Sequence, residues 1–227
     1  MTPALPLGCV IAVLGAQGTG KTQLASALTA RLVQRGIAAE LVPDVSLEWR
    51  TRLAREPDDI ERAEIAAEQA FRIASAAEQG VVVADTTALT SAVEGEMRSE
   101  RSGPSNENSL YQLALAAHRG YAVTLLMALD LPRPQDPATN DRAQRTDALL
   151  RAALTRADAP FAVIHGHGPE RLASAWNAIN SRAESAGVSS TSGRSANGER
   201  PWFWPCDKCS DPACEHRLFR DLLAKRS

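Results

Sequence analysis

The chain has 227 residues, of which 44% are hydrophobic and 23% charged, and its 25 Lys and Arg against 27 Asp and Glu give a formal net charge of -2. This balance argues against a basic nucleic-acid-binding protein, and no apolar run reaches the roughly 18 residues needed to span a bilayer. We therefore expect a cytoplasmic protein with no nucleic-acid or membrane partner, built as one α/β domain of ordinary size plus an appendage.

The first predicted element is a strand over residues 9–14, a continuous apolar run of the kind buried on both faces of a parallel sheet. The pattern G-x-x-x-x-G-K-[ST] follows at once and is matched at every fixed position. Its eight residues are Gly15, Ala16, Gln17, Gly18, Thr19, Gly20, Lys21 and Thr22. Apolar residues then recur at helical spacing from Thr22 to Gln34, and Gly36 marks the end of this helix.

A glycine loop between a strand and a helix presents backbone N–H groups to phosphate oxygens, and the helix dipole adds positive potential there. We expect this loop to bind ATP, with Lys21 on the β- and γ-phosphates and the Thr22 hydroxyl on Mg²⁺. The alternative is a chance match. Lys21 is one of only three lysines, and the other two are Lys208 and Lys225.

A second strand is predicted over residues 41–43, a helix over 59–79 and an apolar strand over 81–85. Asp85, at the end of that strand, is expected to hold the metal's water shell, although it could be a turn residue. Thr86 stands where ATPase motors carry a catalytic Glu, and the lysine of a guanine-specific N-K-x-D element is missing between Lys21 and Lys208. Motor and GTPase functions are therefore disfavoured.

The rest of the predicted domain has a mobile loop over residues 91–108, a helix over 110–118, a strand over 123–129 and a polar lid over 131–145. A helix capped by Thr146, a strand over 161–164 and a helix over 169–179 complete it. Strand and helix alternate five times, which predicts a P-loop NTPase three-layer sandwich with a parallel five-stranded sheet over residues 1–184.

Two functions remain open for such a domain. As an ATP-dependent kinase of a small metabolite, it would use Asp44 to contact the acceptor hydroxyl, and Arg142 and Arg145 of the lid to neutralise the transferring phosphoryl group. Alternatively, Asp44 could be a turn residue, and Arg142 and Arg145 could be solvent-exposed residues of a loop. As a regulatory switch, it would bind and hydrolyse ATP without any acceptor.

Residues 9–180 resemble the P-loop kinase family typified by the nicotinamide-riboside kinase domain of NadR-type regulators. The resemblance rests on the loop 15–22, on the segments 42–44 and 48–50, on Glu68-Gln69, and on the run 83–90. It implies binding of ATP with Mg²⁺ and phosphorylation of a ribosyl hydroxyl. The sequence departs from the family on the acceptor side, where Asp44 replaces Glu and residues 91–94 lack an aromatic residue.

A Ser/Gly/Asn-rich stretch over residues 185–200 predicts a flexible linker, and residues 201–227 form a small Cys-rich tail. The tail holds three cysteines and a histidine within eleven residues, at Cys206, Cys209, Cys214 and His216. This donor set suits tetrahedral Zn²⁺, and free thiols or an iron–sulfur or redox role are the alternatives. A protein partner of the tail is a further expectation.

Overall fold

The structure is a computed structural model that describes residue 3 and residues 5–102, 107–132 and 136–191. Residues up to Thr191 form one compact unit, and the predicted zinc tail lies outside the described residues. The strands of this unit are β1 (Val10–Leu14), β2 (Ala39–Val42), β3 (Val81–Asp85), β4 (Val123–Met127) and β5 (Ala162–Ile164). Its helices are α1 (Lys21–Gln34), α2 (Val45–Leu53), α3 (Asp59–Ala77), α4 (Ala88–Ser102), α5 (Glu107–His118), α6 (Pro137–Arg156) and α7 (Gly168–Thr191).

The five strands pair in parallel in the order β2-β3-β1-β4-β5, which confirms the predicted sheet. From β1 the chain passes first to β2 and then to β3, which both lie on one side of β1. It later passes to β4 and β5 on the other side, so the strand order reverses at β1. Ligands of open α/β sheets bind beyond the carboxyl ends of the strands at such a reversal. The glycine loop that follows β1 therefore stands at the favoured place for a ligand.

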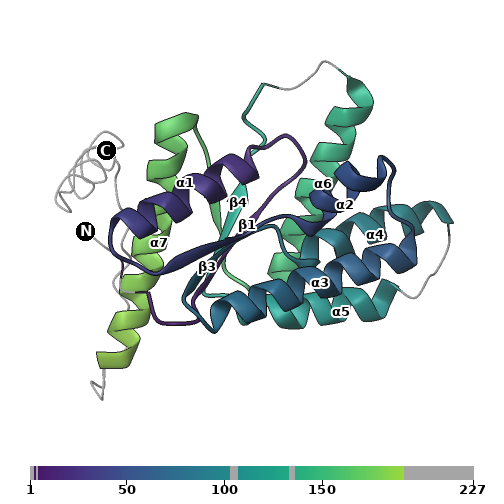
Figure 1. The fold of residues 1–227 in the computed structure, drawn as a ribbon. Helices are drawn as coiled ribbons and strands as arrows, with labels where there is room; N and C mark the ends of the chain where they lie inside the picture. Colours follow the sequence, from purple (N-terminus) through teal and green to yellow (C-terminus); the bar gives the residue numbers. More distant parts are fainter. Residues whose placement is uncertain (1–2, 4, 103–106, 133–135, 192–227) are drawn as a thin grey trace, which may run out of the picture. The chain divides into compact units, whose positions relative to one another are not determined.

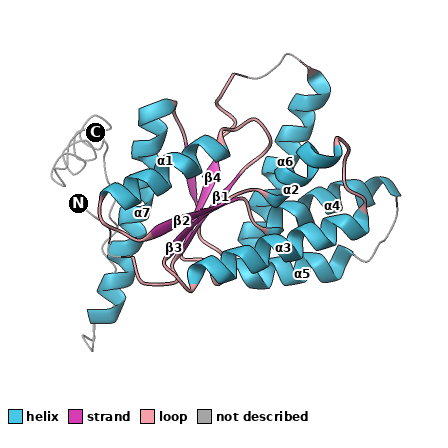
Figure 2. Ribbon diagram, viewed as in Figure 1, coloured by secondary structure: helices cyan, strands magenta, loops and turns pink. Residues whose placement is uncertain are grey.

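Helices cover both faces of the sheet, with α1 and α7 on one face and α3 to α6 on the other (Figure 1, Figure 2). The period-two alternation of strand side chains divides the core between these faces. Ile11 and Val13 of β1 pack with α1 and α7, whereas Leu14 packs with helices of the opposite face. All five residues of β1 are buried, which explains why its sequence is apolar without interruption.

The predicted mobile loop over residues 91–108 is wrong for its first part, because α4 runs through it to Ser102. Leu89, Ala92 and Val93 recur at helical spacing and are all buried against α5 and α6. This apolar face outweighs the cost of Gly95 within the helix, which is about 1 kcal/mol relative to alanine.

The predicted lid is also largely helical. Asp136 caps α6 by accepting hydrogen bonds from the backbone N–H groups of Ala138 and Thr139, and Pro137 occupies the first turn, where its missing N–H costs nothing. Thr146 was expected to cap this helix, but it lies in the middle and donates its hydroxyl to the carbonyl of Arg142 at 2.8 Å. Arg142 and Arg145 therefore belong to a helix rather than to a loop.

Two further helical segments differ from expectation. Helix α2, which follows directly after Asp44, was not predicted, since its residues show little apolar periodicity and bury only Val45. Helix α7 continues to Thr191, seven residues into the predicted linker, because a helix that has already begun can extend through small residues such as Ser and Ala. The rest of the predicted linker lies outside the described residues.

Candidate active site

The glycine loop owes its path to three glycines with positive φ, at 149° for Gly15 and 79° for both Gly18 and Gly20. A side chain at Gly15 would place its Cβ 2.8 Å from the Cβ of Met127, so β4 lies directly against the start of the loop. Gly20 is the left-handed N-cap of α1 and supplies no capping side chain. The first N–H groups of the helix thus remain available to an anion.

Hydrogen bonds inside the loop hold it in shape. The carbonyl oxygen of Ala16 accepts both the Thr19 hydroxyl at 2.8 Å and the Lys21 ammonium at 3.1 Å. Burial lowers the pKa of Lys21 below its ordinary value, although the nearby carboxylates of Asp44 and Asp85 oppose that shift. The ammonium is therefore positioned beside the loop, with two carboxylates near it.

Asp85 ends β3, next to Val13 of β1 in the sheet register. It is 1% exposed, and its Oδ1 has no hydrogen-bond partner among the described residues. Burial raises the pKa of Asp85, whereas a hydrogen bond from Thr22 and the charge of Lys21 lower it. A hydroxyl and an unpartnered carboxylate oxygen side by side are ligands of the kind Mg²⁺ prefers, so Thr22 and Asp85 fit a magnesium ion that is completed by phosphate oxygens.

A cavity of about 220 Å³ joins the loop to the acceptor side of the sheet. The residues lining it are Gly15, Gln17, Gly18, Gly20, Lys21, Thr22, Gln23, Asp44, Ser46, Leu47, Arg50, Thr86, Thr90, Ser91 and Glu94. We call this the phosphate cavity. It brings together Lys21, Thr22 and Asp44, three of the residues singled out from the sequence.

Asp44 has a structural task as well as a place in the cavity. Its Oδ1 caps α2 by accepting the backbone N–H groups of Ser46 at 2.8 Å and Leu47 at 3.1 Å. Both cap bonds use Oδ1, which leaves Oδ2 for a ligand. The turn interpretation and the acceptor interpretation of Asp44 are thus compatible, since each uses a different oxygen.

Gln69 of α3 faces neither solvent nor the phosphate cavity. It is 1% exposed, accepts the N–H of Val45 at 2.9 Å and donates to the carbonyl of Pro43 at 3.2 Å. The side chain amide thereby holds the residues on both sides of Asp44. No local pattern could identify this role, because residues 43–45 and 69 meet only in the folded sheet.

Glu94 and Arg50 are the functional candidates that the sequence did not single out for a role. Both line the phosphate cavity, from α4 and α2 respectively. Burial raises the pKa of Glu94, whereas the charges of Arg50 and Arg142 lower it. Arg142 acts on the cavity through this charge but does not line it, and neither does Arg145.

A second cavity, of about 390 Å³, lies on the other side of the loop. We call it the apolar cavity, and it is lined by Gly20, Gln23, Leu24, Ala27, Leu131, Gly168, Pro169, Arg171 and Leu172. Gly20 and Gln23 line both cavities, so a single elongated ligand can pass along the loop from one to the other.

The described residues contain neither a clustered metal site nor a membrane-spanning helix. Within residues 3–191, apart from the gaps noted above, no group of three or more His, Cys, Asp or Glu side chains could hold a metal ion. This statement does not extend to the predicted zinc ligands Cys206, Cys209, Cys214 and His216, which lie outside the described residues. None of the helices described is both long and apolar enough to cross a membrane.

Comparison with known proteins places this geometry in a family. A family model described as an AAA domain matches residues 10–171. Two solved structures of NadR resemble the chain, both at 18% sequence identity. The match to NadR in complex with NR has a TM-score of 0.60 and covers 78% of this chain and 51% of the NadR chain. The match to NadR in complex with NAD and AMP-PNP has a TM-score of 0.58 and covers 87% of this chain and 52% of the NadR chain. This chain therefore spans about half the length of those structures.

Thymidylate kinase from Ehrlichia chaffeensis is also similar, at 16% identity and TM-score 0.50, over 69% of this chain and 91% of its own. A search of curated proteins finds no match. At these identities the solved structures establish the P-loop fold, and the family model establishes membership.

Proposed function

The chain belongs to this AAA-domain family, and on that premise we propose that it is an ATP-dependent kinase acting on a hydroxyl group of a nucleoside-like or related small metabolite. The observation that carries the proposal is the phosphate cavity, where a phosphate-binding loop and the carboxylates of Asp44 and Glu94 face one space. Two carboxylates opposite the loop can hydrogen-bond the hydroxyl groups of an acceptor, whereas a hydrolytic switch needs only the loop and one group that orients water. The structural likeness to proteins described as NadR and thymidylate kinase supports the same interpretation.

The proposed reaction transfers the γ-phosphoryl group to an acceptor hydroxyl. The hydroxyl oxygen forms a bond to the γ-phosphorus, the bond from that phosphorus to the bridging oxygen of ADP breaks, and Asp44 takes the hydroxyl proton on its free Oδ2. Lys21 leaves the Ala16 carbonyl and neutralises the β- and γ-phosphates. Thr22 and Asp85 would hold Mg²⁺, which shields the charge of the phosphate oxygens.

The apolar cavity supplies a place for the nucleotide base. Leu24, Leu131 and Leu172 offer apolar surface to a flat ring, and the cavity adjoins the loop at Gly20. We propose that ATP lies with its base there and its γ-phosphate in the phosphate cavity. Arg142 and Arg145 of α6 are proposed to close over the phosphoryl group, which requires α6 to move toward the cavity.

The acceptor is proposed to be polar and compact. The far wall of the phosphate cavity offers Asp44, Glu94, Arg50 and the hydroxyls of Thr90 and Ser91, and no aromatic side chain lines this cavity within the described residues. A ribosyl or other polyhydroxyl group can satisfy such a wall by hydrogen bonding. A nucleotide base that requires stacking on an aromatic ring would find no such ring among the described residues of this wall.

The proposal is tested by ADP formation with and without candidate acceptors, with the Lys21→Ala variant as background. A kinase forms ADP at a rate that rises at least tenfold with one polyhydroxyl metabolite and yields its phosphate ester. A slow ADP release that no member of the panel changes would instead assign the chain to the regulatory switch class.

For the tail we propose a separate zinc site at Cys206, Cys209, Cys214 and His216, supported by the donor set and by the small size of the segment, since modules of this length usually need a metal to fold. Protein purified under reducing conditions should carry about one zinc per chain. Replacing Cys206 and Cys209 by Ser should remove it and leave ATP binding intact. Retention of zinc by that variant, or its absence from the parent protein, would contradict the assignment.

A further inference from the structure

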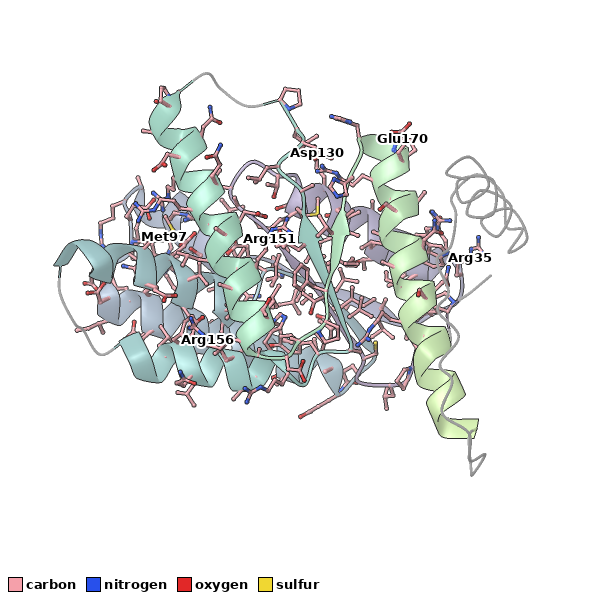
Figure 3. All side chains as sticks on the ribbon, turned by 180° about the vertical axis from the view of Figure 1, so that it is seen from behind. Arg35, Met97, Asp130, Arg151, Arg156 and Glu170 are labelled. Atoms are coloured by element: carbon pink, nitrogen blue, oxygen red, sulfur yellow. The ribbon has the colours of Figure 1, made fainter. Side chains whose placement is uncertain are left out.

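Arg171 is a buried arginine that the proposed reaction does not use. It lies in the first turn of α7 and is 5% exposed. Its Nη1 donates to the backbone carbonyl of Thr19 at 2.5 Å, and its Nη2 pairs with Asp130, which follows β4. The second oxygen of Asp130 accepts the N–H of Gly166, after β5, at 2.8 Å. Asp130, labelled in Figure 3, thus joins the ends of two strands to α7.

Stability alone does not explain this arginine. A cation in the first turn of a helix meets the positive end of the helix dipole, which is unfavourable. The Nε of Arg171 has no hydrogen-bond partner among the described residues, so part of the buried guanidinium remains unsatisfied. Apolar residues of similar volume often stabilise a protein as well as or better than a buried ion pair. Its particular contacts therefore call for another explanation.

The contact with Thr19 fixes a peptide of the phosphate loop. In a trans peptide the carbonyl of one residue and the N–H of the next point in opposite directions, and this chain has no cis peptide bond among its described residues. When Arg171 holds the Thr19 carbonyl on the side of the apolar cavity, the N–H of Gly20 turns to the opposite side. Gly20 is free to rotate without such a restraint, because it is a glycine at φ 79°.

Asp130 in turn orients Arg171. Burial raises the pKa of Asp130, but the hydrogen bond from Gly166 and the neighbouring Arg171 bring that pKa below its ordinary value. Asp130 is therefore a carboxylate at neutral pH. With Nη2 held by Asp130, Nη1 of the planar guanidinium is directed at Thr19, a two-point geometry that lysine cannot reproduce.

We propose that Arg171 is a positioning residue for the triphosphate: it fixes the Thr19–Gly20 peptide so that the Gly20 N–H faces the bound phosphates, and Asp130 holds Arg171 in place. The inference rests on the proposed use of this loop for ATP, but it concerns binding alone and needs neither an acceptor nor turnover. It also gives the carboxyl ends of β4 and β5 a direct link to the phosphate loop.

The experiment measures calorimetric binding of ATP and of inorganic tripolyphosphate to folded Arg171→Met protein. Loss of a positioned hydrogen bond predicts affinity for both ligands about 10–100-fold weaker. Tripolyphosphate carries no base, so an equal loss for both locates the defect at the phosphates rather than in the apolar cavity. Arg151→Met is the matched control, because Arg151 pairs with Asp147 on the surface of α6, and its affinities should equal the parent's.

Arg171→Lys and Asp130→Asn extend the test if the methionine variant does not fold. Both keep a similar volume, and each should weaken tripolyphosphate by at least threefold while the melting temperature stays near that of the parent protein. The double variant Asp130→Asn with Arg171→Met should lose no more tripolyphosphate affinity than Arg171→Met alone, since both changes release the same peptide. Parent-like tripolyphosphate affinity in folded Arg171→Met or Arg171→Lys would overturn the proposal, whereas failure of the Lys21→Ala variant to lose affinity would instead overturn the use of the loop.

Discussion

The two walls of the phosphate cavity, which we call the loop wall and the acceptor wall, are built in different ways. On one wall the groups are backbone amides and two side chains from the consecutive residues 15–22, shaped by three glycines. On the acceptor wall they are side chains of Asp44, the N-cap of α2, of Arg50 in α2 and of Glu94 in α4, which are 50 positions apart at their extremes. The first wall depends on local conformation, and the second depends on how helices pack. We infer that phosphate binding tolerates change elsewhere in the chain except at Arg171 and Asp130, which hold the loop from outside. Acceptor choice, in contrast, is sensitive to how α2 and α4 pack.

The largest expected effect is on the loop wall. Lys21→Ala should lower turnover by about 10³-fold or more and weaken ATP, because it removes a positioned charge that no other lysine of the domain can replace. Steady-state kinetics and ATP titration measure this. Thr29→Ala, on the same helix but outside both cavities, is the matched control. Turnover that survives in Lys21→Ala would remove the loop from the mechanism.

The acceptor wall is tested at Asp44. Asp44→Asn should lower turnover by roughly 10²–10⁴ at near-normal ATP affinity, the range for loss of a positioned base. Asparagine caps helices as well as aspartate does, so α2 and the melting temperature should be preserved. Asp44→Ala should lose a further ~1 kcal/mol of stability with the cap. An unchanged rate in Asp44→Asn would leave Asp44 with capping alone.

A smaller effect is expected at Gln69, which acts on the acceptor wall without touching it. Gln69→Ala releases Pro43 and Val45, and should reduce kcat about tenfold and stability by about 1–3 kcal/mol. KM for ATP should not change, since the loop wall is independent. Gln69→Glu accepts from Val45 but, when ionised, places a buried unpaired charge against the Pro43 carbonyl. It should therefore lose at least as much stability as Gln69→Ala. A rise in KM for ATP would show that the walls are coupled.

The smallest effect on either wall should come from His118, at the end of α5. It is buried, with Nε2 3.0 Å from the Thr124 hydroxyl, rather than a helix-end cation as its position suggests. Burial lowers the pKa of His118 from 6.5 to about 4. The unfolded chain therefore takes up the proton first, and stability should fall by about 3 kcal/mol as pH drops from 6.5 to 4.

Urea unfolding of parent protein and His118→Gln over that pH range measures the contribution of His118. The difference between the two stabilities should change with pH in the stated direction, and turnover at neutral pH should be the same. A pH-independent difference would mean that His118 is not buried in its neutral form.

The sequence predicts much of the loop wall because its information is contiguous. An apolar strand, the spaced glycines of residues 15–20 and an amphipathic helix specify strand, loop and helix with little help from the rest of the chain. The three central strands β1, β3 and β4 follow for the same reason, since all their residues are buried and nearly all are apolar.

The acceptor wall could not be predicted in this way. Helix α2 buries only Val45 and so lacks a clear apolar period, and α4 contains a glycine that suggests a loop. Without these two helices, Glu94 and Arg50 cannot be placed near Asp44. The capping of α6 by Asp136 could not be predicted, because a proline such as Pro137 is as compatible with a loop as with the first turn of a helix.

The partly buried ammonium of Lys21 also offers a chemical way to measure whether nucleotide is bound to this protein. No other side-chain amine occurs before Lys208, so amine acylation followed by proteolysis assigns any label on residues 5–102 to a single atom. A lowered pKa leaves more of that amine unprotonated, and therefore nucleophilic, at neutral pH. Bound triphosphate would engage the same nitrogen and shield it, so the extent of acylation becomes a direct measure of how much protein carries nucleotide.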